Sequence, residues 1–236
     1  MESIFENPES HYKVTFKRDG QSFLSMLGVI VKPFDRSLVS LLTREEIKIA
    51  EKYTGSRYSE FVHSRYITKR AVQQLMGDVP MDKIQLLKGV FEQPILEIAG
   101  SGAGYDASVA HKDDIAASLI FPRYHPAGID IDVTVPRNSN TLNRLITEHE
   151  QQVCRGDSEK KMVIYTAKEA LSKIIRCGLT VPVHFLEVND LQKEEIFYCG
   201  VFTNFCQYRF MSFAGDEYII TMVFPRNSNC TIEKMH

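Results

Sequence analysis

The sequence lacks the cysteine pattern of a zinc site or of a disulfide framework. Its five cysteines are odd in number, and no two of them have the spacing Cys-x-x-Cys. Both kinds of framework need cysteines in pairs, so neither is expected here. Free, buried thiols in a reducing compartment are the interpretation that this count favours.

A strong excess of basic residues is also missing, because 28 Lys and Arg residues face 30 Asp and Glu residues and the formal net charge is −2. General nucleic-acid binders usually carry a large positive charge, so nucleic acid is not an expected partner. The chain has no run of about 18 apolar residues that could span a membrane. Its start, MESIFENPESHYK, lacks the basic and apolar regions of a signal peptide. We therefore expect a cytoplasmic protein with no membrane span.

The chain does contain three short segments that occur twice, in the same order and at similar separations. The pairs are LLTREE (41–46) with LITEHE (145–150), YITKRAV (66–72) with YTAKEAL (165–171), and DDIAASLIFP (113–122) with DEYIITMVFP (216–225). Each match alone would be chance, but together they indicate an internal duplication. We expect two similar halves, residues 1–125 and 126–236.

Local patterns predict the elements of each half. Thr43 with Glu46, and Thr147 with Glu150, fit the capping box that begins a helix. Longer helices are expected at 56–76 and 159–176, ended by Gly77 and Gly178. Strands are predicted at 23–31, 114–121, 128–135, 181–188, 197–203 and 217–224. The fold class is therefore α+β.

The pentapeptide GIDID (128–132) carries a candidate metal site. Successive side chains on a strand alternate between its faces, so Asp130 and Asp132 point the same way. Adjacent carboxylates repel unless a cation lies between them, and oxygen ligands suit Mg²⁺. Glu150 could complete the site, although its capping box already gives it a structural role. The alternative is an exposed strand face with solvated acids.

Two further groups of charged residues have both a functional and an ordinary interpretation. Tyr165, Glu169 and Lys173 recur every four residues on the helix face opposite its apolar stripe. Glu169 and Lys173 could be catalytic, or could form a surface ion pair worth about 0.2–0.5 kcal/mol. The second group, which could bind phosphates or be a solvated face, comprises Arg57, Arg65, Lys69 and Arg70 on one helix, with His111 and Lys112 on a later segment.

Together these features resemble the phosphopantetheinyl transferases of the surfactin and enterobactin synthetase type. That family has a GIDIE-like strand, a W/F/Y-x-x-K-E-x-x-x-K helix after it and a Ser-His element before it. The corresponding segments here are GIDID (128–132), YTAKEALSK (165–173) and VAHK (109–112), and RYSEFVHSRYITKRA (57–71) resembles the family's basic helix. The resemblance extends over most of the chain.

The resemblance implies a fold, a reaction and a set of roles. It implies two α+β halves related by pseudo-twofold symmetry, with the active site at their interface. An internally doubled chain can form such a site as a monomer, and the sequence leaves the oligomeric state open. The reaction would move 4'-phosphopantetheine from coenzyme A to a serine of an acyl or peptidyl carrier protein, release 3',5'-ADP and depend on Mg²⁺. The implied metal ligands are Asp130, Asp132 and Glu150; the catalytic pair is Glu169 and Lys173; coenzyme A contacts are Arg57, Arg65, Lys69, His111, Lys112 and Lys168.

The sequence departs from the family pattern at three positions. Asp132 replaces the glutamate of GIDIE and is one methylene shorter, Ala110 replaces the serine before the histidine, and Tyr165 stands where tryptophan is usual. Either Glu169 or a metal-bound hydroxide that it orients could deprotonate the serine. Fatty-acid, polyketide, nonribosomal-peptide and siderophore carrier proteins remain open as acceptors. The rival functions are a metal-dependent phosphoester hydrolase and a binding module without catalysis.

Overall fold

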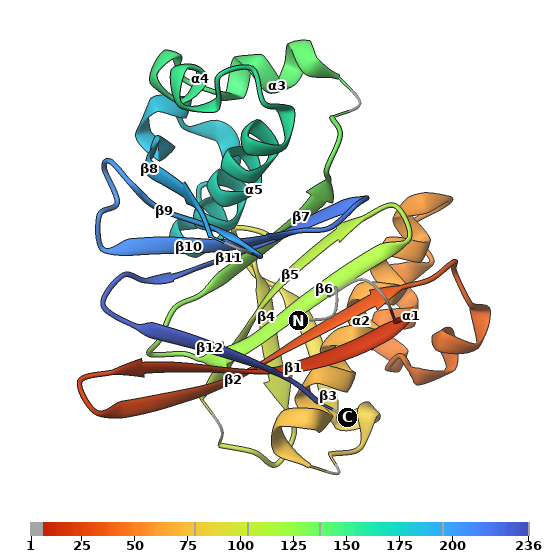
Figure 1. The fold of residues 1–236 in the computed structure, drawn as a ribbon. Coiled ribbons are helices and arrows are strands. Elements are labelled where there is room, and N and C mark those ends of the chain that lie inside the picture. Colours follow the sequence, from red (N-terminus) through yellow and green to blue (C-terminus); the bar gives the residue numbers. More distant parts are fainter. Residues whose placement is uncertain (1–6, 78, 103, 137, 195, 236) are drawn as a thin grey trace. The chain divides into compact units, whose positions relative to one another are not determined.

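The computed structural model of the protein describes residues 7–77, 79–102, 104–136, 138–194 and 196–235. They form helices and antiparallel sheets, so the predicted α+β class is confirmed. The chain divides into two compact units, the first made of residues 7–126 and 228–235 and the second of residues 127–227 (Figure 1). Within the described part of the chain, no helix is long and apolar enough to cross a membrane.

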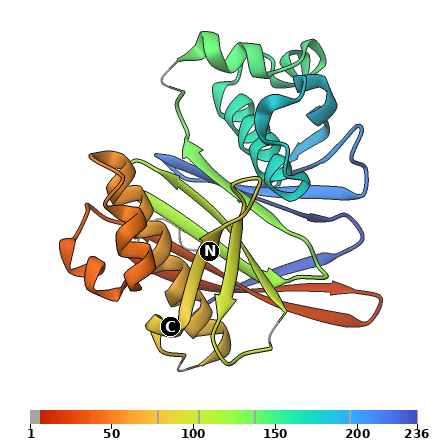
Figure 2. The same cartoon turned by 180° about the vertical axis from the view of Figure 1, so that it is seen from behind.

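The first unit is built on a five-stranded antiparallel sheet with the order β12-β1-β2-β6-β5. The long helix α2 covers one face of this sheet, and a two-stranded hairpin, β3–β4, lies beside it (Figure 2). The strands are β1 (Glu9–Arg18), β2 (Gln21–Val31), β3 (Ile84–Lys88), β4 (Pro94–Ile98), β5 (Tyr105–Lys112), β6 (Ile115–Pro122) and β12 (Asn229–Lys234). The helices are α1 (Arg44–Ala50) and α2 (Ser56–Met76), with 3₁₀ turns η1 (Arg36–Leu41) and η2 (Met81–Lys83).

The second unit has its own five-stranded sheet, with the order β7-β11-β10-β9-β8 and helix α5 packed on it. Its strands are β7 (Gly128–Val133), β8 (Val188–Lys193), β9 (Tyr198–Phe202), β10 (Tyr208–Ala214) and β11 (Tyr218–Pro225). Its helices are α3 (Ser139–Leu145), α4 (Glu148–Cys154) and α5 (Ser158–Ile175), with 3₁₀ turns η3 (Gly178–Thr180) and η4 (Val183–Leu186).

In each unit, a glycine on the strand that packs against the long helix lets helix and sheet approach closely. A Cβ on Gly28 of β2 would lie 3.0 Å from Ile67 Cγ1 of α2, and one on Gly128 of β7 would lie 2.4 Å from the Ala170 carbonyl oxygen of α5. The second contact is impossible for any residue with a side chain, so Gly128 determines how closely β7 and α5 pack. Ala71 of α2 also lies against Gly28.

The two capping boxes form as predicted and are each joined to a buried lysine. Thr43 and Glu46 begin α1, and Thr147 and Glu150 begin α4, with both reciprocal hydrogen bonds present in each case. In the first unit Lys69 Nζ lies 2.8 Å from Glu46 Oε2. In the second, Lys168 Nζ lies 2.5 Å from Glu150 Oε2. The same buried arrangement in both units agrees with the duplication seen in the sequence.

Three predicted boundaries differ from the structure. Within the predicted strand 181–188, Val183–Leu186 form a 3₁₀ turn and the strand begins only at Val188, because Pro182 has no amide hydrogen for a sheet ladder. Helix α5 ends in a left-handed residue at Arg176 (φ 58°), before the expected Gly178. The C-terminal strand β12 pairs with β1, so residues 228–235 lie in the first unit and not with residues 127–227.

Candidate functional site

A pocket of about 700 Å³ lies in the first unit, between α2, the β3–β4 hairpin, β5 and the residues around the end of α1. Its apolar surface comes from Tyr53, Phe61, Leu86 and Val109. A flat aromatic ligand fits such a surface, since ligand pockets combine apolar walls with a few convergent polar groups.

Five basic side chains line this pocket. The sequence predicted three of them, Arg57, Arg65 and His111, and the structure brings these three together. It adds Lys52 and Lys88, which the sequence analysis did not select. The sequence did not predict the strands at 84–88 and 94–98, so it could not place Lys88 near α2. This density of positive charge suits a phosphate-bearing ligand.

Arg65 is the most buried of the pocket's cations. Its guanidinium carbon lies 4.1 Å from the Phe61 ring centroid, within cation–π range. Burial lowers the pKa of Arg65 despite the opposing charge of Glu46, and its buried Nε atom has no hydrogen-bond partner in the described part of the chain. The positive charge of this guanidinium, which lines the pocket, suits an anionic ligand.

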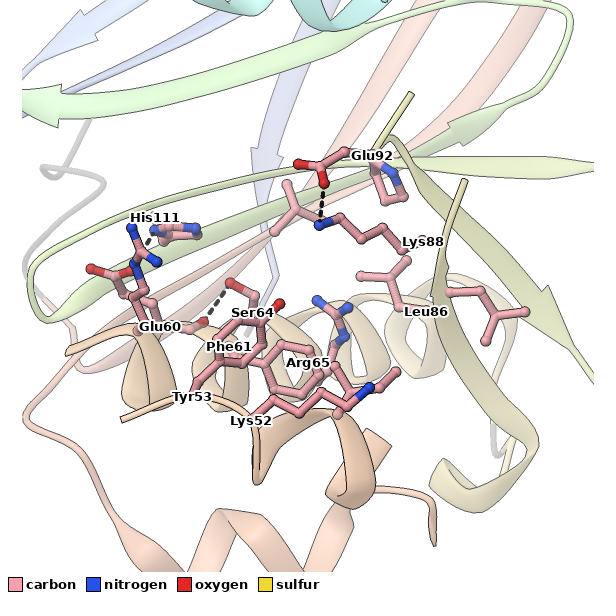
Figure 3. Close-up of a pocket in the computed structure, with 15 residues that line it drawn as sticks. Lys52, Tyr53, Glu60, Phe61, Ser64, Arg65, Leu86, Lys88, Glu92 and His111 are labelled. Atoms are coloured by element: carbon pink, nitrogen blue, oxygen red, sulfur yellow. Dashed lines mark hydrogen bonds and ion pairs between the residues drawn. The ribbon is translucent and has the colours of Figure 1, made fainter. Parts of the chain in front are cut away.

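Two acids also line the pocket and partly neutralise it. His111 Nδ1 lies 3.4 Å from Glu60 Oε2, and Lys88 Nζ lies 2.7 Å from Glu92 Oε1. Figure 3 shows these two pairs on different sides of the pocket, with Arg65 between them. Both pairs are partly exposed, so a phosphate could compete with either carboxylate at small cost.

Two of the coenzyme A contacts predicted in the first unit, Lys69 and Lys112, do not line this pocket. Lys69 is 2% exposed, and its ammonium is bonded to Glu46 and to the carbonyl oxygens of Leu41 and Met81 at 3.1 and 3.0 Å. Its place in the helical basic stripe suggested a surface residue, but that turn of α2 faces α1. Lys112 follows His111 on β5, and successive side chains of a strand point to opposite faces.

In the second unit, β7 and α5 form an acidic cluster made of Asp130, Asp132 and Glu169, with Tyr165 and Lys173. Lys173 Nζ donates to Asp130 Oδ1 and to the Ile129 carbonyl oxygen, both at 2.8 Å. Tyr165 OH donates to Glu169 Oε1 at 3.4 Å. The helix pair therefore does not form a simple surface salt bridge, because Lys173 pairs with the strand.

The charges of this cluster perturb one another. Burial, opposed by Lys173 and aided by Asp132, raises the pKa of Asp130. Burial and the charge of Asp130 raise the pKa of Glu169. Burial and the neighbouring carboxylates raise the pKa of Tyr165 as well. A cation placed beside these carboxylates would relieve the repulsion that Asp130 and Glu169 experience.

Glu150 does not belong to this cluster, contrary to the role that the family resemblance implied. It is 0% exposed, its Oε2 accepts from Thr147 N and Lys168 Nζ, and its Oε1 accepts from Val188 N at 2.7 Å. Lys168 is equally enclosed and donates its other bond to the Leu145 carbonyl oxygen. Both residues hold α4 and α5 together, which leaves neither free for a ligand.

The chemistry of the acidic cluster fits a divalent cation such as Mg²⁺. In the described part of the chain, no three Asp, Glu, His or Cys side chains are already gathered as a metal site. Asp132 Oδ1 accepts from Val133 N at 2.7 Å, and Asp130 is paired with Lys173. All three carboxylates offer the hard oxygen atoms that Mg²⁺ prefers. Glu169, on which the charge of Asp130 acts, is the third carboxylate of this cluster.

Comparison with known proteins adds a family match. Residues 126–223 match the model of the 4'-phosphopantetheinyl transferase superfamily, so the predicted resemblance is confirmed at the level of the superfamily for this part of the chain, which holds the acidic cluster. No curated protein matches the chain. A holo-(acyl-carrier-protein) synthase from Bacillus anthracis str. Ames, in complex with CoA (3',5'-ADP), is 21% identical over 45% of this chain and 96% of its own, with a TM-score of 0.36. A holo-acyl-carrier-protein synthase from Thermotoga maritima is 15% identical over 51% and 74%, with a TM-score of 0.34.

Proposed function

We propose that this chain transfers the 4'-phosphopantetheine group of coenzyme A to a serine of an acyl or peptidyl carrier protein and releases 3',5'-ADP. The observation that carries the proposal is the acidic cluster of Asp130, Asp132 and Glu169 with Lys173, inside the segment that matches the superfamily. The basic pocket of the first unit supports it, because coenzyme A carries both an aromatic base and phosphates.

We propose that Mg²⁺ acts only by stabilising negative charge on the substrate. Held by Asp130 and Asp132, it would stabilise the negative charge that develops on the pyrophosphate as the bond to 3',5'-ADP breaks. Lys173 adds a second positive charge next to Asp130. Electrostatic stabilisation of this kind is usually the largest contribution to phosphoryl transfer.

Glu169 is the proposed base for the carrier serine. An efficient general base has a pKa near the working pH, and burial with the Asp130 charge raises the pKa of Glu169 in that direction. The Tyr165 hydroxyl, which donates to Glu169 Oε1, restricts the orientation of this carboxylate. The serine proton would pass to Glu169, while the serine oxygen attacks the phosphorus and 3',5'-ADP leaves.

The nucleotide is assigned to the pocket of the first unit. Arg65 and His111 would contact its phosphates, and the rings of Tyr53 and Phe61 offer a surface for the adenine. Ala110 cannot donate the hydrogen bond that a serine would give there, so the additional cations Lys52 and Lys88 would have to compensate.

The test is incubation of the protein with coenzyme A, Mg²⁺ and an apo carrier protein, followed by mass spectrometry of the carrier. We expect a mass gain of one phosphopantetheine group, abolished in Asp130→Asn but retained in Asp216→Asn, whose side chain is exposed outside the cluster. Hydrolysis of coenzyme A without modification of the carrier would instead identify a phosphoester hydrolase. Neither reaction, with coenzyme A bound, would identify a binding module.

A further inference from the structure

A second charged cluster lies in the first unit, where β1 begins and β2 ends against α2. Its centre is the Glu9 carboxylate, which accepts from Tyr66 OH at 2.6 Å and from Arg70 Nε at 3.0 Å. His11 Nε2 lies 3.9 Å from the same carboxylate. The Lys32 ammonium lies 5.5 Å from the centre of the Tyr66 ring. Tyr66, Arg70 and His11 thus lie around one carboxylate, and Lys32 lies over the Tyr66 ring.

The helical residues of this cluster occupy the positions on α2 that Tyr165 and Glu169 of the acidic cluster occupy on α5. The strand residues do not correspond in the same way, because Gly28 pairs with Ser118 and Asp130 pairs with Thr221, which are matching positions of the repeated strand segments. The repeat of YITKRAV in YTAKEAL aligns the two helices, with the corresponding residues Tyr66 and Tyr165, and Arg70 and Glu169.

The charge at one of these corresponding helix positions is reversed. Arg70 is a cation where the second unit has Glu169, while the tyrosine is kept. The acidic cluster contains an internal cation, Lys173, and the basic cluster contains an internal anion, Glu9. Each copy of the duplicated scaffold therefore supplies a counter-ion for its own charge.

The basic cluster has the properties of a binding site more than those of a surface ion pair. Burial raises the pKa of Glu9, but the hydrogen bonds from Tyr66 and Arg70 outweigh it and hold that pKa below its ordinary value. Burial and the bond to Glu9 raise the pKa of Tyr66 to about 12. His11 is 8% exposed, and its Nε2 has no hydrogen-bond partner in the described part of the chain although it faces Glu9.

We propose that Tyr66, Arg70 and His11 form a carboxylate-binding site and that Glu9 is its resident ligand. The charge-assisted hydrogen bond from Arg70 and the hydroxyl of Tyr66 select a planar carboxylate, and His11 Nε2 faces the same carboxylate. Glu9 thereby fastens the start of β1 to α2. The inference rests on the first unit alone and stands whether or not the chain transfers phosphopantetheine.

The test is rescue of a vacated site by a free carboxylate. Glu9→Ala in the full chain should lower Tm by roughly 5–10 °C, because charged hydrogen bonds are lost and Arg70 is left unpaired. Sodium acetate should restore part of this loss with a saturable dependence on concentration, against sodium chloride at equal ionic strength. The matched control is Glu233→Ala, which removes an exposed partner of Lys13 at 3.6 Å and should show no saturable response.

Two further variants keep the test decisive. Glu9→Ala/Arg70→Met should lose the acetate response, since the principal donor is gone. If Glu9→Ala does not fold, Glu9→Gln fills the site with a neutral side chain, and its Tm loss should not add to that of Arg70→Gln in a double-mutant cycle. Equal acetate responses in Glu9→Ala and Glu233→Ala, or additive losses in the cycle, would overturn the proposal.

Discussion

At the scale of single residues, the decisive feature is the pairing of Lys173 with the buried Asp130. An ammonium at 2.8 Å from one carboxylate oxygen supplies, inside the protein, the charge that three neighbouring acids require. A divalent cation that binds Asp130 must compete with this ammonium. Once displaced by the cation, the Lys173 ammonium can contact an anionic substrate. The side chain would therefore pair with Asp130 in the metal-free protein and take its proposed catalytic role in the metal-bound protein.

Lys173→Met tests this competition without any turnover. Removing the internal cation should raise the affinity of the protein for Mg²⁺ alone about tenfold (about 1.4 kcal/mol), measured by titration calorimetry in the absence of coenzyme A. Lys160→Met, on the same helix but outside the cluster, should leave the affinity unchanged. Weaker Mg²⁺ binding in Lys173→Met would contradict the competition. Failure of all three proteins to bind Mg²⁺ would instead argue against the metal site itself.

Glu169→Gln separates the proposed base from a structural role. The variant should lower kcat by roughly 10²–10⁴, the usual contribution of a general base. Its Tm should hold or rise, because the raised pKa of Glu169 means that its charged form is disfavoured in the folded state. The exposed Glu148 provides the control variant Glu148→Gln. Near-wild-type kcat in Glu169→Gln would remove Glu169 from the mechanism.

At the scale of elements, each capping box is connected to the long helix of its unit by one buried lysine. Glu46 and Glu150 each begin a short helix and each bind the lysine of the K-R-A or K-E-A segment. A carboxylate that accepts hydrogen bonds from a helix N-terminus, a lysine ammonium and a strand amide links these elements and has a structural role. This explains why Lys69 and Lys168 are unsuited to a substrate.

Lys168→Met should therefore act on stability. We expect a loss of about 3–5 kcal/mol, since Glu150 would remain buried and charged without its partner. The double variant Lys168→Met/Glu150→Gln should lose less, because no uncompensated charge remains. Urea unfolding would measure both. A stable Lys168→Met protein with a raised KM for coenzyme A would restore the role that the family resemblance implied.

At the scale of the whole molecule, burial shifts the pKa of different kinds of side chain in the two units. Burial lowers the pKa of His11, His63 and His125, all in the first unit. His125 is stacked between Phe16 and Phe23 and bonded to Ser228, so the C-terminal segment depends on it. Burial raises the pKa of Asp130 and Glu169 in the second unit.

The histidines predict that stability falls as the pH falls through about 6.5, the ordinary value for unfolded histidine. Between that value and the lower pKa of the folded state, the unfolded chain binds more protons, so the free energy of unfolding rises with pH. His63→Leu should reduce this slope in urea titrations between pH 5 and 7, because neither His63 ring nitrogen is hydrogen-bonded in the described part of the chain. An unchanged slope would show that His63 does not take up a proton when the chain unfolds.

The sequence alone determined the local structure and much of the chemistry. The capping boxes, helix α2 and the shared face of Asp130 and Asp132 follow from side-chain spacing and short-range hydrogen bonding, which neighbouring residues specify by themselves. The repeat of three segments indicated two related units. The resemblance supplied Glu169 and Lys173 as partners in one site.

The tertiary structure decided which charges are available to a ligand. Glu46, Lys69, Glu150 and Lys168 look like surface residues because their partners lie far away in the chain, and burial depends on those partners. Strand β12 joins the first unit because its backbone pairs with β1, a contact between the two ends of the sequence. The clusters around Asp130 and Glu9 likewise combine a strand with a distant helix. Spacing along a chain reports neighbours on one element, whereas charge compensation is settled only when elements pack.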